Sequence, residues 1–311
     1  MSAHEAVARL HASLSRAQRA EVCYAWDQRD DRRGLGVVRT FIANYWRVTR
    51  PPVRSDFFTR EQQLLVHDVF KALIDPDWYP RVMRQVHQDT HGHDWGTDHA
   101  VALIENGETG ALHFVFTGRH MTVRTQTGPV PSAAFGGAVM YGHQASGFYE
   151  RPNHPDNVYW EMSLAMSELA ATLDAQQVAA AVLDRLAPEA ELSFGRAPAG
   201  LPAASLDAAQ LALLERVFAG LLAPFRAEDR ARAQECVRLN GGLARCHVQL
   251  ARDGRMSAPH WDIWRIEGPA MTCQFHGFPH VHVWLHIADD PATPVLARTG
   301  RFLFPGHDEL T

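Results

Sequence analysis

The spacing of hydrophobic residues along the 311-residue chain changes from a helical period to a strand period, and then does so again. In the first part, helical spacing covers residues 5–25, 58–74 and 78–88. Alternating spacing follows over 99–105 and 111–124, which predicts two strands joined by the turn 105–110. Glycine and proline are frequent over 125–157, so we expect a long loop there.

The same order returns in the second part. Helical spacing covers residues 159–186, 205–225 and 227–238, with a linker over 188–202. Strand spacing covers 243–251, 260–267, 270–276 and 279–287, and an irregular tail is expected after Pro291. This order predicts an α+β protein of two units, 1–157 and 158–311, each made of helices and an antiparallel sheet and together forming one globule.

The two units resemble each other in sequence. Residues 59–74 match 207–222 at an offset of 148, and Gly118 with Met121-Thr122 matches Gly268 with Met271-Thr272 at an offset of 150. Near-constant offsets predict a duplication, with a site where the two sheets meet. The alternative is chance similarity between amphipathic helices in a chain rich in Ala and Leu.

The strongest candidate for chemistry is the segment His276-Gly-Phe-Pro-His280-Val-His282-Val-Trp-Leu-His286-Ile287. On a strand, alternate residues share a face. The apolar residues from Val281 to Ile287 then face a core, and His280, His282 and His286 face the other way. A three-residue hairpin would place His276 opposite His280 and Gln274 opposite His282.

This arrangement predicts a metal site, because imidazole nitrogens bind Zn, Cu and Fe and converging histidines supply several of them. His280 and His282 are the leading ligands, and His276 is a fourth ligand or supports them. The alternative is a polar sheet face with titrating histidines. His120, in Gly118-Arg119-His120, shares its parity with an apolar strand face and is the preferred ligand from the first unit. A buried histidine of this kind could instead pair with a carboxylate or a carbonyl.

Residues near these histidines are candidates for substrate binding. They are Arg119, Trp261, Arg265, Gln274 and His286. Arg119 could equally pair with an acid, and Trp261 could belong to an aromatic core. The cluster His91, His93 and His99 lies between a predicted helix and a predicted strand, where either a ligand or a solvated loop is possible.

Composition narrows the class of protein. Thirty Lys and Arg residues against 35 Asp and Glu give a net charge of −5, which argues against a nucleic-acid binder. The apolar runs are too short for a membrane span, and the first residues do not resemble a signal peptide. Four scattered cysteines without a C-x-x-C pair fit a cytoplasmic protein and argue against thiolate metal ligands. Eighteen histidines favour a metal site.

Several motifs are similar to the family catalogued as domain of unknown function 3500. They are Gly118-Arg119-His120, Arg265-Ile266 with Gly268-Pro269, and His280-x-His282, in the family's order. The resemblance implies a site at these motifs and no established activity. The family pattern has a Glu where this chain has Gln274, and an Arg-Asp pair where it has His286-Ile287. A triad of two histidines and a Glu, as in non-haem iron sites, is therefore in doubt here.

Together these features predict a metal-dependent enzyme with a mononuclear, histidine-rich site holding Cu, Fe or Zn and acting on a small molecule or peptide. No carboxylate stands beside the His motif in the sequence, which favours an oxidoreductase. The alternatives are a zinc-dependent hydrolase or lyase and a metal-binding or scaffold protein without turnover.

Overall fold

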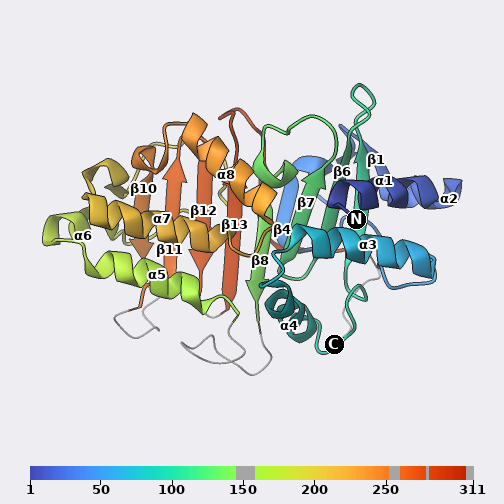
Figure 1. The fold of residues 1–311 in the computed structure, drawn as a ribbon, viewed down its shortest axis with the longest axis horizontal. Coiled ribbons are helices and arrows are strands. Elements are labelled where there is room, and N and C mark those ends of the chain that lie inside the picture. Colours follow the sequence, from blue (N-terminus) through green and yellow to red (C-terminus); the bar gives the residue numbers. More distant parts are fainter. Residues whose placement is uncertain (145–157, 252–259, 278–279, 306–311) are drawn as a thin grey trace.

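A single large mixed sheet with helices on one face forms the centre of the molecule (Figure 1). The computed structural model describes residues 1–144, 158–251, 260–277 and 280–305. The ten strands lie in the order β1-β5-β6-β7-β8-β13-β12-β11-β10-β9. All neighbours in this sheet are antiparallel except β1 and β5. The predicted α+β class is confirmed at this level.

The first half supplies five of the ten strands. They are β1 (Cys23–Ala25), β5 (Ala100–Glu105), β6 (Leu112–Gly118), β7 (Met121–Gln126) and β8 (Val139–His143). Two predictions were wrong here. The range 111–124 is two strands, because the chain reverses at Arg119 and His120, and the expected loop 125–157 contains β8, a short run that pairs on both sides.

The second half supplies the other five strands. They are β9 (Leu201–Pro202), β10 (His247–Ala251), β11 (Ile263–Gly268), β12 (Met271–His276) and β13 (Val281–Ile287). The two halves join where β8 and β13 pair, with Val281 opposite His143 and Leu285 opposite Val139. The sheet is therefore continuous across the expected boundary at residues 157 and 158.

Eight helices are found in the described residues. They are α1 (Ala3–Ser13), α2 (Arg16–Val22), α3 (Arg60–Leu73), α4 (Tyr79–Asp89), α5 (Trp160–Ala171), α6 (Ala175–Ala181), α7 (Ala208–Leu222) and α8 (Ala227–Leu239). Capping boxes start α1, α2, α3, α6 and α7. The predicted helix 159–186 is broken in two, because Asp174 caps a new helix, and the chain leaves the helical path after Ala181.

The main core lies between the helices and one face of the sheet. Val101, Phe116, Tyr141 and Val283 belong to it, together with apolar residues of α1, α3, α5, α7 and α8. The alternate residues of the strands face the other way and are covered in part by β4 (Phe41–Trp46). Strand β4 pairs with β14 (Leu296–Phe302), and β2 (Arg29–Asp30) pairs with β3 (Gly36–Val37).

The tail after Pro291 was predicted to be irregular, and this was wrong. Strand β14 pairs in parallel with β4, so the last described strand packs on the first half of the chain. Its outer residues are polar, which removed the alternating apolar signal from the sequence. Among the described residues, no helix has both the length and the apolar character needed to cross a membrane.

Candidate metal centre

The apolar residues of strand β13 face the core, as predicted, but the strand pairs with β12 in a different register from the one expected. His282 lies opposite His276, and Gln274 lies opposite Trp284. The expected pairs, His276 with His280 and Gln274 with His282, were therefore wrong by two residues. A register shift of two residues keeps every side chain on the same face of the sheet, so the predicted faces of β13 are unaffected by it. Phe278 and Pro279, the centre of the expected turn, lie outside the described residues.

His120 lies in the tight turn between β6 and β7, not on a strand. Its φ of 50° is in the left-handed region, which is uncommon for a residue other than glycine. The backbone N–H of His120 donates to the carbonyl of Asn44, which fixes the turn against β4. The prediction that His120 shares the parity of an apolar strand face was wrong, because the residue lies in the turn. The imidazole is nevertheless 3% exposed.

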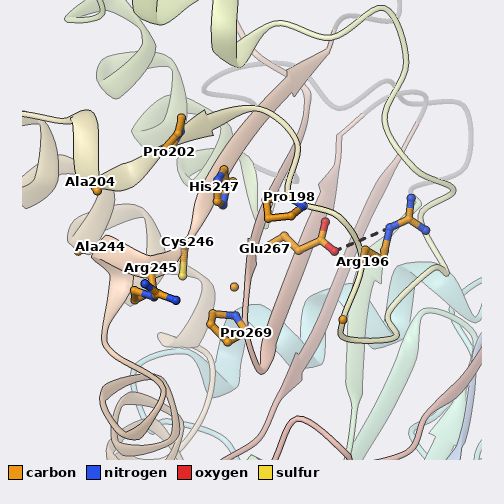
Figure 2. A pocket seen from close by; sticks show the side chains of 12 residues that line it. Arg196, Pro198, Pro202, Ala204, Ala244, Arg245, Cys246, His247, Glu267 and Pro269 are labelled. Atoms are coloured by element: carbon orange, nitrogen blue, oxygen red, sulfur yellow. Dashed lines mark ion pairs between the residues drawn. The ribbon is translucent and has the colours of Figure 1, made fainter.

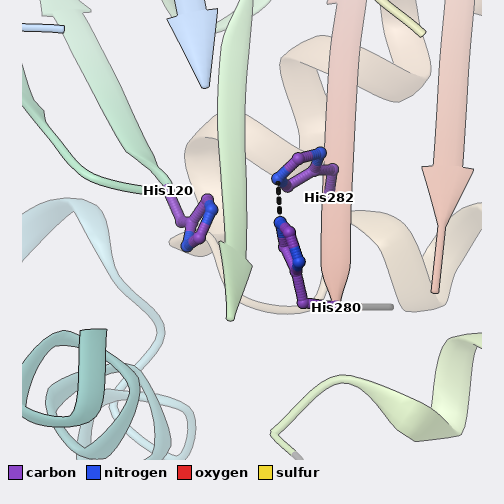
Figure 3. A group of neighbouring side chains, drawn as sticks. All are labelled: His120, His280 and His282. Carbon is purple, nitrogen blue, oxygen red and sulfur yellow. Dashed lines mark hydrogen bonds between the residues drawn. The ribbon is translucent and has the colours of Figure 1, made fainter. Parts of the chain in front are cut away.

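Three imidazoles from the two halves converge next to the seam between β8 and β13 (Figure 3). One nitrogen from each of His120, His280 and His282 lies within 4.8 Å of the other two. Nε2 of His280 and Nε2 of His282 are 2.9 Å apart. The centroid of the His120 ring is 5.0 Å from that of His280 and 4.9 Å from that of His282.

Gly142 makes this convergence possible. It lies on β8, opposite His282, and a Cβ built on it would point toward His120. A Cβ at this position would collide with the carbonyl oxygen of Val281 and would lie 3.4 Å from Cβ of His120. The missing side chain lets imidazoles from both sides meet across β8. Sequence reasoning missed Gly142, because a glycine in a predicted loop carries no special signal.

Asp89 orients His120. It is the last residue of α4, and its Oδ2 lies 3.2 Å from Nδ1 of His120. Gln85 and the backbone N–H of Gln144 also donate to this carboxylate, at 2.8 and 2.7 Å. A carboxylate at a helix C-terminus is disfavoured by the helix dipole, so these three bonds offset an intrinsic cost. They commit Nδ1 of His120 to Asp89 and leave Nε2 available.

Glu189 has the same relation to His282. Its two carboxylate oxygens lie 2.9 and 3.1 Å from Nδ1 of His282. This glutamate comes from the segment predicted as a linker, which passes over the polar face of the sheet. A carboxylate behind each of two histidines selects the tautomer with a free Nε2, an arrangement typical of metal-binding histidines. Sequence reasoning missed both acids, because they lie 31 and 93 positions from their partners.

Burial favours neutral imidazoles in this cluster. It lowers the pKa of His280 to about 3, with the neighbouring histidines His282 and His120 adding to the effect. Burial also lowers the pKa of His120, against the opposing influence of Asp89. For Glu189, burial raises the pKa, but the hydrogen bond and charge of His282 outweigh it and the net pKa is lowered. The neutral form is therefore favoured for His280 and His120, and a neutral imidazole has the nitrogen lone pair that a metal ion requires.

His276 does not join the three converging histidines. It belongs to a second group with Glu189 and His282, whose ligand atoms also lie within 4.8 Å of one another. Its Nδ1 is 3.7 Å from Oε2 of Glu189. His276 lies with Glu189 on the Nδ1 side of His282, whereas His280 lies on the Nε2 side. The prediction of His276 as a fourth ligand of the three-histidine group was therefore wrong.

The predicted substrate-binding residues divide into two kinds. Arg119 is half-buried beside His120, and its guanidinium contacts Gln144 at 2.6 Å and His91 at 3.4 Å, both neutral acceptors. Arg265 and Gln274, in contrast, are buried in the sheet, where Arg265 pairs with Glu267 at 3.1 Å. These two residues serve the packing of β11 and β12.

His286 and Trp261 are also structural. Nδ1 of His286 bonds to the carbonyl of Leu192 at 3.1 Å, and its ring stacks on Phe194 with centroids 4.2 Å apart. The backbone of Trp261 is held by Ser163 and Ser167 of α5. Neither side chain belongs to the groups of metal-ligating residues found in the described chain.

The histidine loop after α4 supplies no member of the triad. His93 pairs with Asp98 at 3.1 Å. His99 is buried against the ring of Phe116, and burial lowers its pKa to about 4. Nε2 of His91 lies 3.4 Å from the guanidinium of Arg119. This cluster combines an ion pair, a core residue and a contact to the arginine beside the site.

A third group of ligand-type residues and a cavity lie elsewhere in the molecule. His11, Cys23 and Glu105 form a third group, but the Arg19 guanidinium lies 2.7 Å from Nε2 of His11 and repels a cation. A cavity of about 350 Å³ lies by the start of β10 and the end of β11 (Figure 2). Its wall includes the ion pair of Arg196 with Glu267 and none of the converging histidines.

Comparisons with family models, with curated proteins and with solved structures gave no match to this chain. The similarity to the family of domain of unknown function 3500 therefore remains a prediction, carried by the motifs described above.

Proposed function

We propose that the protein is a metal-dependent enzyme whose mononuclear centre is held by Nε2 atoms of His120, His280 and His282. The observation that carries this proposal is the convergence of three imidazole nitrogens, two of them on the buried rings of His120 and His282, which Asp89 and Glu189 hold. Three neutral ligands fit Cu, Fe or Zn and leave coordination positions for water or substrate.

An oxidoreductase acting on a small molecule or peptide is the first candidate. Both carboxylates beside the site, Asp89 and Glu189, are engaged with imidazole Nδ1 atoms. Neither is therefore placed as a free general base for hydrolysis. A redox-active ion would supply electron transfer or oxygen activation at the open positions. The protein's own contribution is to bring the three rings together and to hold the buried rings of His120 and His282 through Asp89 and Glu189.

A zinc-dependent hydrolase or lyase is the second candidate, and the donor set favours it. Three neutral histidines form the ligand set of catalytic zinc sites that lower the pKa of bound water to about 7. The two candidates share the centre and differ in the ion. A metal-binding protein without turnover is the third possibility.

Arg119 is the best-placed residue for substrate recognition. It neighbours His120 in the chain, and among the described residues its polar partners are Gln144 and His91 rather than an acid. Its charge is thus available to an anionic group. This favours a substrate that carries a carboxylate.

We also propose that the two halves derive from one duplicated unit, which would explain why the site lies at their junction. Matching hydrogen-bond networks support this. Gln18 and Gln62 bond to each other and to the carbonyls of Phe57 and Ser13. Gln177 and Gln210 do the same with Ser205 and Thr172. Gln62 and Phe57 stand 148 positions before Gln210 and Ser205, which is the offset of the sequence match between 59–74 and 207–222, and Gln18 and Ser13 stand 159 positions before Gln177 and Thr172.

Elemental analysis of untagged protein purified without chelators tests the proposal. About one equivalent of Cu or Fe supports the redox candidate and directs assays to oxygen consumption. One equivalent of Zn moves hydrolysis to first place. Protein that neither contains metal nor takes it up on titration would refute the proposed centre.

A further inference from the structure

We propose a second cation position on the opposite side of the His282 ring, held by Nδ1 of His282, the Glu189 carboxylate and His276. His282 would then lie between two metal ions. This inference rests on the proposed function, because His282 is shared with the first centre.

The geometry of the second group is that of a ligand set. Oε2 of Glu189 lies 2.9 Å from Nδ1 of His282 and 3.7 Å from Nδ1 of His276. Ligands at about 2.0–2.2 Å from zinc stand about 3.2–3.6 Å apart around a tetrahedral ion. The two separations from Oε2 of Glu189 bracket this range, and the ligand atoms of all three residues lie within 4.8 Å of one another. The three residues come from separate segments, with side chains 19%, 25% and 6% exposed for Glu189, His276 and His282.

The charge of the two groups differs in a way that suits two ions. The first centre offers three neutral imidazoles, whereas the second contains a carboxylate. Glu189 lowers the net charge of the second group by one, which offsets part of the repulsion from an ion on the far side of the ring. The partial exposure of His276 also provides a route for water to complete the coordination.

His282 can serve both positions because its two ring nitrogens point in opposite directions. Nε2 lies 2.9 Å from His280, and Nδ1 lies 2.9 Å from Glu189. With one ion at Nε2, Nδ1 keeps its proton and donates it to Glu189. A second ion at Nδ1 requires that proton to leave for solvent, and Glu189 changes from hydrogen-bond acceptor to ligand.

Zinc titration of the metal-free, full-length protein, followed by calorimetry, tests the inference. The wild type is expected to take up two equivalents, and His276→Ala one. Saturating the wild type with zinc should release about one proton more per molecule than saturating His276→Ala. The number of released protons follows from the difference in binding enthalpy between two buffers of unequal ionisation enthalpy. His247→Ala, which removes a half-buried histidine from β10 outside the ligand groups, is the matched control and should keep two equivalents.

A second measurement keeps the inference testable if His276→Ala does not fold. Two Cu²⁺ ions joined through one imidazolate are magnetically coupled. The electron paramagnetic resonance signal of wild-type protein with two copper equivalents should then account for clearly fewer spins than bound ions. A signal that accounts for one spin per bound copper ion would contradict a His282 shared by the two ions.

The outcomes separate the two proposals. One equivalent in both the wild type and His276→Ala would overturn the second position and leave the three-histidine centre standing, with Glu189 only orienting His282. No uptake by the wild type would overturn both.

Discussion

His282 and His286 stand on the same strand and the same face, four residues apart, yet they have different surroundings. His282 has a carboxylate at Nδ1 and a second imidazole at Nε2. His286 has the carbonyl of Leu192 at Nδ1 and the ring of Phe194 stacked against it. Both are buried, with 5% and 1% of their surface exposed. Burial and strand parity therefore do not distinguish a ligand from a packing residue.

The difference arises on the neighbouring strands and in the segment above them. His282 lies beside Gly142, which leaves space for His120 to approach from the first half. His286 lies beside Thr272 of β12, and the segment with Leu192 and Phe194 closes over it. A histidine on this face becomes a candidate ligand where a neighbouring strand lacks a side chain and an acid stands behind the ring.

Gly142→Ala should have the largest effect, because it removes the feature that separates the two environments. The added Cβ would meet the carbonyl oxygen of Val281, which is backbone and cannot move aside cheaply. We expect a loss of about 3 kcal/mol or more in the free energy of unfolding, together with weaker metal binding. Denaturant unfolding and a metal titration measure the two. Gly220→Ala, in α7 with nothing within 4 Å of the added Cβ, is the control and should cost nothing.

Asp89→Asn and Glu189→Gln should each weaken metal binding at the three-histidine centre by about 10–100-fold while leaving its three imidazole ligands in place. Each change removes the charge that holds an imidazole Nδ1–H. Competition with a chromogenic chelator measures the affinity. Asp98→Asn, which alters the carboxylate beside His93, should leave the affinity unchanged. Equal affinity in all three variants and the wild type would remove the orienting role of the two acids.

His286→Ala should behave in the opposite way. It deletes a buried ring and its bond to Leu192, so we expect a loss of about 2 kcal/mol in the free energy of unfolding. Metal affinity should stay within a few-fold of the wild type, because the ring takes no part in the three-histidine group. A parallel loss of affinity would mean that the polar face of β13 acts as one unit.

Acid should destabilise the protein through its buried packing histidines. Burial lowers the pKa of both His99 and His286 to about 4, below the ordinary value of 6.5 that they regain on unfolding. The unfolded chain therefore binds more protons between these values, and stability falls as the pH drops from about 6.5 to 4. Each residue should cost about 1 kcal/mol at pH 5.5 relative to pH 7. Urea unfolding at both pH values checks this, and His286→Gln should lose its share of the dependence.

Much of the fold could be predicted from periodicity. Helices such as α3 and α7 bury one apolar stripe and start at a capping box. Their existence and their first residues can therefore be predicted from nearby residues in the sequence. Strands β8 and β14 could not be predicted, because β8 is only five residues long and β14 carries polar residues on an outer edge. Their pairing is decided by distant partners, β13 and β4, which a local pattern does not report.

The same distinction applies to the site. His280 and His282 could be named because H-x-H on a strand is a local signal. His120 was named from a strand parity that the structure does not bear out, and its place beside them depends on the turn after β6. Asp89 and Glu189 could not be found, since only the packing of α4 and of the segment before α7 brings them behind the rings. The sequence offers no obvious general-base carboxylate beside the His motif, and the two acids that the fold brings there are both engaged with imidazole nitrogens.

The most direct test compares metal binding by His282→Ala and His286→Ala at neutral pH. The two variants remove the same ring from the same face of the same strand. If the three-histidine centre is correct, His282→Ala loses more than 100-fold in affinity, beyond what a change to an orienting residue costs, and His286→Ala keeps the wild-type affinity. Equal metal binding by the two variants would contradict the assignment of the centre.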